Sequence, residues 1–541
     1  MKVSIQETPS HLPRSEAFAG GRKVPSLKTK EDRVDVVFIY PKTGIDLGAT
    51  IGPPHALLSV AAPLLKKGFK VKIVDQRTDA HWRETLSGML AQRPICVALT
   101  SMTGTQIYFA LEAAKLVREV SNGKIPIVWG GAHPSSLPEQ TLKSEYVDVV
   151  CIGEGDITFL ELVQVLANKE PLDQVKGIVF KDGVKMTMTP GRPLLDVETL
   201  LPVPWELVDV EKYIHRDFYL KETRRSLDIG QTSRGCPFQC GFCSSAALRH
   251  RQWRPMSVKR SLEMILEPVK RFHLDGIWIR DDEFYIDRER AYEICQGIID
   301  SGVKIKWYTS GTRVNIFNMA TDKDLDILKR SGADTLKFGA ESGSNRILKL
   351  MKKGIRCEDT IEANLKAKRH GIIPVFALMI GFPTETFEDI DKTIDLFVRL
   401  KKDNPKAQFE IIGTFTAMPQ TPLYEVALQH GLHPPQSLEG WIDWLSDEYD
   451  MEGKKIPWFN ASERKKIGNI TYMSLLANSS LNAIGGVSNN AMRLLLKLFI
   501  SPLSRYEGYK LRRKLYGFSP ELDFMRFLRR KVFYRRNQSI H

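Results

Sequence analysis

Long apolar runs are missing from this chain of 541 residues. No stretch of about 18 apolar residues is present, which argues against a membrane-spanning helix. The N-terminus has no apolar core of signal-peptide length, so we expect a cytoplasmic protein. Apolar residues make up 43% and charged residues 26% of the chain, as is usual for a globular protein. The length predicts about three domains.

Cysteine is also scarce, with seven residues, too few for a disulfide scaffold. Three of them, Cys236, Cys240 and Cys243, form a C-x3-C-x2-C run, and the other four are scattered and expected to be buried small hydrophobic residues. Three clustered thiolates can hold one face of an iron–sulfur cubane and leave one iron open to a substrate or cofactor. A zinc site is the alternative, but it needs a fourth ligand, and His250 and His273 lack the spacing of a zinc finger.

Residues 1–32 are polar and turn-rich, and we expect a loose leader there. From residue 33 to residue 170, short apolar runs alternate with helical patterns. Strands are expected at 34–40, 70–74, 95–100, 125–129 and 147–152, and helices at 54–67, 81–92, 105–121, 135–143 and 156–168. This alternation predicts a doubly wound, Rossmann-like α/β domain with a parallel sheet. Its ligand should bind beyond the carboxyl ends of the strands.

Three small or polar loops follow strands of this domain, at 101–104, 130–133 and 153–156. Any one of them is explained as a tight strand-to-helix turn. Three on the same edge favour a ligand with an extended, partly anionic part, because glycine lets a ligand approach the backbone closely.

A second series of strands follows a Pro-interrupted connector at 171–225, which has some strand character of its own at 177–181 and 184–188. Strands are expected at 227–232, 276–280, 304–309, 335–339, 373–380 and 409–414. Six such βα units predict an open, incomplete (β/α)6 barrel over 226–429, in which catalytic groups lie at the carboxyl ends of strands. The three-cysteine loop directly follows the first of these strands.

The region 430–541 is expected to be mostly helical, and it ends in a basic tail. Residues 491–541 carry 13 Lys and Arg against three acidic residues, a net charge of +10 out of +14 for the whole chain. Two interpretations stay open: a helical cap that packs on the barrel, and a basic amphipathic segment in peripheral contact with an anionic membrane. Nucleic acid is not expected as a partner, because no recognition module is visible.

The motifs at the barrel strand ends resemble those of the radical SAM superfamily, in particular its branch with an N-terminal cobalamin (B12)-binding domain. They are Thr-Ser-Arg-Gly-Cys-Pro-Phe-Gln-Cys-Gly-Phe-Cys-Ser (232–244), Asp-Asp-Glu-Phe (281–284), Gly-Ala-Glu-Ser-Gly (339–343) and Gly-Phe-Pro-Thr-Glu-Thr (381–386). The resemblance covers roughly residues 34–425, with the motifs in the same order. The cysteine loop is its most specific part.

The resemblance implies that Cys236, Cys240 and Cys243 bind a [4Fe-4S] cluster whose open iron takes S-adenosylmethionine. Reduction would then give a 5′-deoxyadenosyl radical that abstracts hydrogen from an unactivated carbon. Phe242 would pack beside adenine, and Arg313 would pair with the methionine carboxylate, unless it only forms an ion pair within the barrel. The remaining cofactor contacts expected in the barrel are Glu341 and Ser342. Asp281 and Asp282 are either ligands or a helix N-cap.

The first loop of the N-terminal domain, 40–48, lacks the histidine with which one well-known cobalamin pattern ligates cobalt. Cobalamin would therefore bind without a protein imidazole on cobalt, or the domain has lost it. The cobalamin contacts expected in the later loops are Ser101, Thr103, Gly130, Gly131 and Glu154.

The function favoured by the resemblance is methyl transfer to an unactivated carbon of a lipid, isoprenoid, tetrapyrrole or natural-product intermediate. An external flavodoxin- or ferredoxin-type protein would supply electrons. One alternative is an oxidative cyclase or carbon–carbon coupling enzyme of the anaerobic magnesium-protoporphyrin ester cyclase type. Another is a non-catalytic cobalamin or redox sensor, which would have no need of a SAM site.

Overall fold

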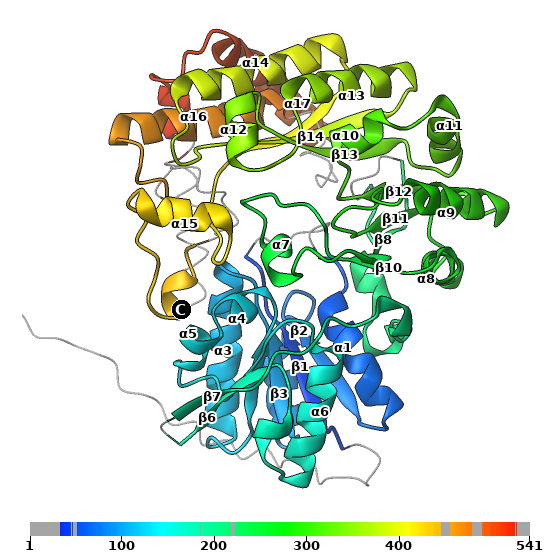
Figure 1. The fold of residues 1–541 in the computed structure, drawn as a ribbon, viewed down its shortest axis with the longest axis vertical. Coiled ribbons are helices and arrows are strands. Elements are labelled where there is room, and N and C mark those ends of the chain that lie inside the picture. Colours follow the sequence, from blue (N-terminus) through cyan, green and yellow to red (C-terminus); the bar gives the residue numbers. More distant parts are fainter. Residues whose placement is uncertain are drawn as a thin grey trace, which may run out of the picture. The chain divides into compact units, whose positions relative to one another are not determined.

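A seven-stranded sheet organises the first part of the chain (Figure 1). The computed structural model describes residues 33–44, 46, 51–183, 185–217, 222–444, 455–478, 490–524 and 526. The leader expected at 1–32 therefore lies outside the described residues. The strand order is β2-β1-β3-β4-β5-β6-β7, in which β1 to β5 run parallel and β6 and β7 are antiparallel additions. The strands are β1 (Val36–Tyr40), β2 (Val71–Asp75), β3 (Cys96–Thr100), β4 (Ile127–Gly130), β5 (Val149–Cys151), β6 (Ile178–Asp182) and β7 (Lys185–Met188).

Helices cover both faces of this sheet, which explains why its central strands are apolar throughout. Side chains of α1 (His55–Lys66) and α6 (Gly155–Asn168) pack with Val36 and Phe38 on one face. Side chains of α2 (Trp82–Leu90) and α3 (Thr105–Val120) pack with Val37 and Ile39 on the other face. Alternate residues of β1 thus feed opposite layers, and the doubly wound domain expected from the sequence is confirmed.

The helix expected at 135–143 is instead two short helices, α4 (Ala132–Ser136) and α5 (Pro138–Leu142). Pro138 is the first residue of α5, and a proline disfavours helical geometry in the residue before it. Leu137 accordingly has φ −135° and ψ 61°. The two strands expected in the connector belong to the first sheet. β6 pairs with β5, and β7 pairs with β6, so the sheet extends to Met188.

Six parallel strands make up the second α/β region, as expected. They form two three-stranded sheets, β8-β11-β12 and β13-β14-β15, joined by a parallel bridge between Thr312 and Phe338. The strands are β8 (Ser226–Gly230), β11 (Gly276–Ile279), β12 (Lys306–Thr309), β13 (Thr335–Glu341), β14 (Ile373–Ile380) and β15 (Gln408–Thr414). The helices between and after them are α7 (Ser244–Leu248), α8 (Val258–Arg271), α9 (Arg288–Asp300), α10 (Val314–Asn318), α11 (Asp322–Arg330), α12 (Asn345–Leu350), α13 (Cys357–Arg369), α14 (Phe387–Asp403) and α15 (Pro422–Gln429).

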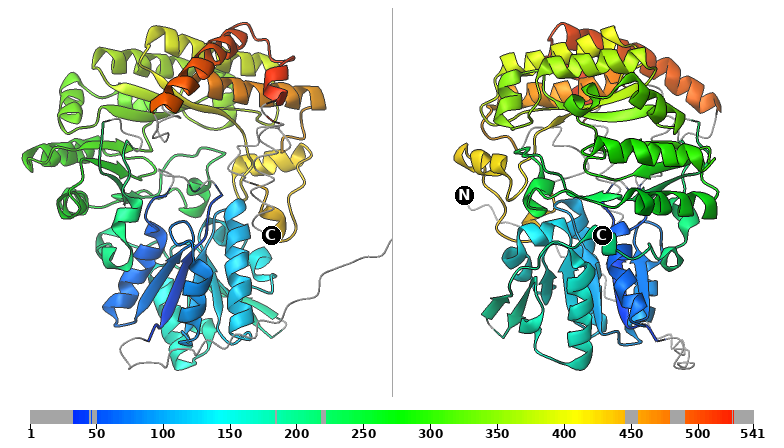
Figure 2. Two further views of the ribbon diagram at one scale, coloured as in Figure 1. Left: turned by 180° about the vertical axis from the view of Figure 1, so that it is seen from behind. Right: turned by 45° about the vertical axis from the view of Figure 1, so that its right-hand side comes forward.

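The cysteine loop leaves β8 through a short antiparallel hairpin of β9 (Ser233–Arg234) and β10 (Arg254–Pro255). Beyond the barrel lie a 3-10 turn, η7 (Glu439–Trp441), and two long helices, α16 (Ala461–Asn478) and α17 (Asn490–Arg512). α16 packs on the last barrel strand, where Ser474 Oγ accepts a hydrogen bond from the Ile412 amide at 3.0 Å. α17 packs on α16 (Figure 2). None of the described helices combines the length and apolar character needed to cross a membrane.

Candidate functional site

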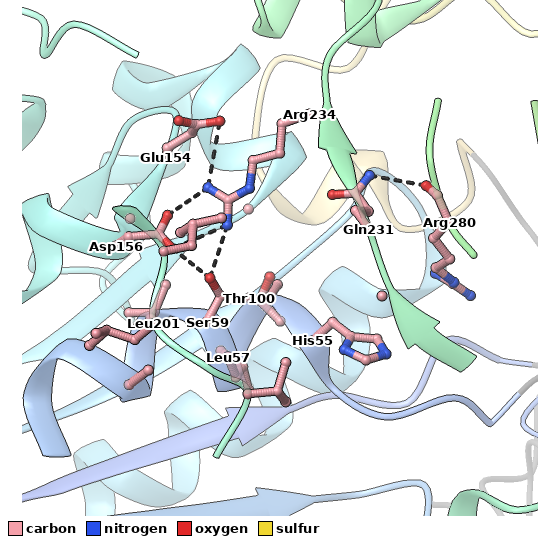
Figure 3. A pocket seen from close by; sticks show the side chains of 18 of the residues that line it. His55, Leu57, Ser59, Thr100, Glu154, Asp156, Leu201, Gln231, Arg234 and Arg280 are labelled. Atoms are coloured by element: carbon pink, nitrogen blue, oxygen red, sulfur yellow. Dashed lines mark hydrogen bonds and ion pairs between the residues drawn. The ribbon is translucent and has the colours of Figure 1, made fainter. Parts of the chain in front are cut away.

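A cavity of about 1290 Å³ is lined by the carboxyl ends of strands from both α/β regions. Its wall includes Thr100, Gly130 and Gly153 from the first sheet, and Gly230, Asp281 and Ser310 from the barrel. Figure 3 shows part of this wall, with side chains of both regions around it. Ligand sites of doubly wound sheets and of (β/α) barrels both lie at these edges. The cavity therefore reaches strand ends of both regions, although the three cysteines are not among its lining residues.

The loops that follow strands of the first sheet allow a ligand to approach the backbone closely. Gly131 has φ +98°, and a Cβ there would lie 2.6 Å from Thr100 Oγ1, so only glycine fits. Gly130 and Gly131 line the cavity, whereas Ser101 and Thr103 are buried and are not among its lining residues. Ser101 Oγ has no hydrogen-bond partner among the described residues. Such an orphaned polar atom is what a bound polar ligand or water would satisfy.

His133 belongs to the same loops and is fully buried. Its Nδ1 lies 3.1 Å from Thr103 Oγ1, and its Nε2 has no described partner. Burial lowers the pKa of His133 to about 4, so the ring is neutral at physiological pH. His133 and Thr103 thus form a neutral polar pair beneath the glycine loop.

Glu154 lines the cavity, but its carboxylate is held by three arginines from the cysteine hairpin (Figure 3 shows one of them). Arg254 lies 2.6 Å from it, Arg249 2.5 Å and Arg234 3.7 Å. Arg234 also pairs with Asp156 at 2.9 Å. Burial by itself would raise the pKa of Glu154, but the arginines lower it overall. We call these five side chains the ion clamp, because they fasten the hairpin to the start of α6.

The three cysteines are free thiols in the loop between β9 and α7. Backbone hydrogen bonds anchor the middle of the loop, from the Gly241 amide to Met351 O and from the Leu423 amide to Gly241 O, both 2.8 Å. Within the described part of the chain, no three His, Cys, Asp or Glu side chains converge on a single metal position. A cubane does not require such convergence, because each thiolate binds a different iron atom. The donor set therefore fits a cluster better than a single ion.

Burial raises the pKa of Cys236 to about 11, and the neighbouring Glu283 and Asp282 act in the same direction. Arg313 brings a positive charge to the cysteine loop: its Nη1 lies 3.5 Å from Cys240 Sγ, and its guanidinium stacks 3.8 Å from the ring centroid of Phe238. Its Nη2 donates to Lys353 O. Arg313 is thus directed at the cysteine loop, and it forms no ion pair with any described carboxylate.

Lys353 links the other expected barrel contacts. Its Nζ donates to Glu341 Oε1 at 2.6 Å and lies 5.8 Å from the ring centroid of Phe242. Glu341 has φ +64°, a left-handed backbone that is unusual for glutamate and is typical of functional sites. The structure therefore brings Phe242, Arg313 and Glu341 together around Lys353.

Ser342 and Asp281 have partners of their own. Ser342 Oγ lies 3.0 Å from Thr393 Oγ1. Asp281 accepts hydrogen bonds from Thr232 N and Oγ1 at 2.6 and 2.7 Å and from Ser233 Oγ at 2.7 Å. Asp281 is therefore not a helix cap, and Asp287 caps α9 instead. Asp281 fixes the start of the cysteine loop.

Several residues of the site have no signal in the sequence pattern. His55 at the start of α1 lies 3.1 Å from Asp228 Oδ1, and Asp228 also pairs with Arg280 at 2.6 Å. Arg234 was visible only as part of the cysteine motif, and its partners on α6 are distant in sequence. Lys353 follows a short helix in an ordinary Met-Lys-Lys-Gly turn. Only the folded chain shows these contacts.

Comparison with known proteins identifies the family. The model of the Radical SAM superfamily matches residues 231–397, and that of the B12 binding domain matches residues 44–163. An uncharacterised methyltransferase of Pyrococcus horikoshii is 33% identical over 459 residues, 83% of this chain and 95% of the relative. The chain belongs to the radical SAM superfamily, in its B12-binding branch. The resemblance found in the sequence is confirmed, and the chain is an enzyme.

Other relatives of this radical SAM enzyme are more distant. The anaerobic magnesium-protoporphyrin IX monomethyl ester cyclase of Cereibacter sphaeroides is 27% identical over 406 residues, 72% of this chain but 63% of the cyclase. The solved structure of the cobalamin-dependent radical enzyme OxsB, with aqua-cobalamin and S-adenosylmethionine bound, matches with a TM-score of 0.69 at 20% identity, covering 92% of this chain and 75% of OxsB. TsrM of Kitasatospora setae, with cobalamin and a [4Fe-4S] cluster bound, matches at 0.58 and 18%, covering 73% and 74%. These structures confirm the fold, and the two family matches support the expected set of a [4Fe-4S] cluster, S-adenosylmethionine and cobalamin.

Proposed function

We propose that this enzyme transfers a methyl group to an unactivated carbon of a hydrophobic or natural-product substrate, using cobalamin and a [4Fe-4S] cluster. The observation that carries the proposal is the cavity lined by strand ends of both α/β regions. A substrate in it would have the cobalamin loops on one side and the cysteine hairpin on another. The names of two relatives support methyl transfer: the Pyrococcus methyltransferase, and the hopanoid C-3 methylase of Methylococcus capsulatus at 26% identity.

The residues of this chain would divide the work as follows. Cys236, Cys240 and Cys243 would hold the cluster, and Arg313 would help to position Cys240. Gly130 and Gly131 would leave room for cobalamin. Bound together, the cofactors would supply S-adenosylmethionine cleavage and a transferable methyl group.

The remaining cofactor contacts are proposed from the sequence motifs and their placement. Phe242, Glu341 and Ser342 would contact S-adenosylmethionine, and Ser101 and Thr103 would contact the cobalamin tail. Glu154 would act mainly through the ion clamp, since its carboxylate is occupied by arginines. An external flavodoxin- or ferredoxin-type donor would reduce the cluster.

The wall of the cavity favours an apolar substrate. It includes a continuous stretch of the connector, residues 200–206, and the side chains of Leu57, Leu201, Val203, Trp205, Met256 and Met264. Apolar surface of this kind is stabilised by removal from water when a hydrophobic molecule binds.

The cluster assignment is tested by anaerobic reconstitution. Wild type should show cluster absorbance and convert S-adenosylmethionine to 5′-deoxyadenosine under reduction, and Cys240→Ala should lose both. Cys357→Ala, which removes a partly buried thiol outside the loop, is the matched control and should keep both. Persistent cleavage in Cys240→Ala would sink the assignment.

Oxidative cyclisation is the second candidate, because anaerobic cyclases from three organisms are 26–29% identical to the chain. Methyl-deuterated S-adenosylmethionine separates the two reactions in extracts of a deletion strain. A product that carries the label supports methyl transfer, whereas an oxidised product without the label supports cyclisation. A non-catalytic sensor would give neither product and no 5′-deoxyadenosine.

A further inference from the structure

One surface at the end of the described chain combines exposed aromatic and cationic side chains. We call it the cationic–aromatic surface; it consists of Arg505, Tyr506, Tyr509, Arg512, Arg513, Leu515, Phe518 and Phe524. Phe518 is 84% exposed, Phe524 60%, Tyr506 52% and Tyr509 47%. Several exposed apolar side chains within one short segment mark an interaction surface more often than single ones do.

The periodicity of α17 separates this surface from the face that packs inward. Residues 505, 506, 509, 512 and 513 are exposed, whereas Glu507, Lys510 and Leu511 are buried. Residues three, four and seven apart share one side of a helix, so the exposed set forms a single stripe. The stripe is not the packed side of a helical cap, because the packed side is already occupied.

The acidic residues of this region are used internally, which leaves the stripe with uncompensated positive charge. Lys510 takes Glu521 as its ion-pair partner. Asp523 pairs with Lys465 at 3.0 Å and with Arg526 at 2.8 Å.

Among the described residues, none of Arg505, Arg512 and Arg513 has an acidic partner. The sequence then adds more cations beyond the surface: Arg529, Arg530, Lys531, Arg535 and Arg536.

We propose that the cationic–aromatic surface docks this enzyme on an anionic lipid bilayer. Arginines attract anionic headgroups over a Debye length, and aromatic rings settle at the headgroup level. A helix that lies in the interface needs this pairing of cations with apolar side chains, and it need not be long enough to span. Leu515 favours lipid over nucleic acid, because an aliphatic side chain offers a base neither stacking nor a hydrogen bond. Docking would give the cavity access to a membrane-dissolved substrate.

The electrostatic part is tested with the full chain by vesicle co-sedimentation. Wild type should bind vesicles that contain phosphatidylglycerol, release them at high salt, and bind phosphatidylcholine vesicles weakly. Arg505→Gln, Arg512→Gln and Arg513→Gln together should weaken binding to the anionic vesicles by roughly a hundredfold, at about one decade or less for each arginine near the surface. The control combines Lys124→Gln, Lys169→Gln and Lys185→Gln, which removes the same charge from exposed positions of the first α/β domain and should bind like wild type.

The apolar part is tested by Phe518→Ser. Loss of one inserted ring should weaken vesicle binding about tenfold and leave its salt dependence unchanged, since no charge is removed. The proposal is overturned if wild type fails to bind anionic vesicles, if the control triple variant loses as much binding as the arginine variant, or if only a fluorescent oligonucleotide is bound. Melting curves of each variant check the fold. No cofactor is needed, so the outcome does not depend on the proposed reaction.

Discussion

Glu385 is a single carboxyl group that the fold holds where ionisation is costly. One of its oxygens accepts hydrogen bonds from the amides of Gly381 and Phe382, at 2.5 and 3.0 Å, and the other has no described partner. Burial raises the pKa of Glu385 from 4.5 to about 8. Between these values the folded chain keeps a proton that the unfolded chain has released, so this residue makes folding less favourable as pH rises through that window.

Glu385→Gln removes this titration. We expect the melting temperature of the variant, relative to that of wild type, to increase from about pH 5 to about pH 8. The corresponding change in the difference of unfolding free energy is on the order of 3 kcal/mol. Glu388→Gln, an exposed change in the first turn of the helix α14 that follows, should show no such trend. A constant difference between Glu385→Gln and wild type across the window would contradict the prediction.

For single residues, the sequence predicted which types of residue belong to the site better than it predicted the contacts that those residues make. The cysteine spacing and the glycine loops are local patterns, and local patterns can be recognised without knowledge of the fold. Arg313 was predicted to pair with the methionine carboxylate of the cofactor, which stays a prediction, but its contacts with Phe238 and Cys240 were not predicted. The contact with Cys240 joins positions 73 residues apart in sequence, and no local pattern encodes it.

At the scale of elements, the ion clamp joins the β9–β10 hairpin to α6. Asp156→Asn removes the charge that faces Arg234 and leaves a mostly buried guanidinium short of a partner. Loss of one member of a buried pair costs about 3 kcal/mol, which urea denaturation can measure. Because Arg234 is two residues before Cys236, the variant should also retain less iron after reconstitution.

The matched control is Glu112→Gln, which breaks the more exposed pair of Arg83 and Glu112. It should cost less than about 1 kcal/mol and leave iron content unchanged. If Asp156→Asn behaved like this control, the clamp would have no role in holding the hairpin.

Strands and helices were predictable because both have periods that the sequence displays. β14, expected at 373–380, is found at Ile373–Ile380. The helix at 135–143 was mistaken because Pro138 interrupts it. The use of β6 and β7 by the first sheet depends on strand pairing, which hydrophobic pattern does not specify.

At the scale of the whole molecule, a second attachment joins the barrel side to the first domain. Trp441 donates from Nε1 to Gln140 Oε1 at 2.6 Å, and its ring centroid lies 5.6 Å from that of His133. Gln420 adds a hydrogen bond to Ser136 O at 2.6 Å. With the ion clamp, this attachment should make the two α/β regions unfold together.

Trp441→Ala should cost about 3–5 kcal/mol and split the calorimetric transition into two, because it empties the space between the regions. Trp307→Ala, a buried change within the barrel, should cost a similar amount and keep a single transition. Two transitions in both variants, or in neither, would contradict this account of domain coupling.

The ion clamp also has a consequence for folding during synthesis of the protein. The acidic residues Glu154 and Asp156 leave the ribosome before Arg234, Arg249 and Arg254, and domains generally fold as units from the N-terminus. The hairpin would then emerge when the first domain, with Glu154 and Asp156, has already folded. Insertion of iron and sulfide would follow the folding of the first domain. A folding defect in that domain would therefore reduce the amount of cluster that the protein acquires in the cell.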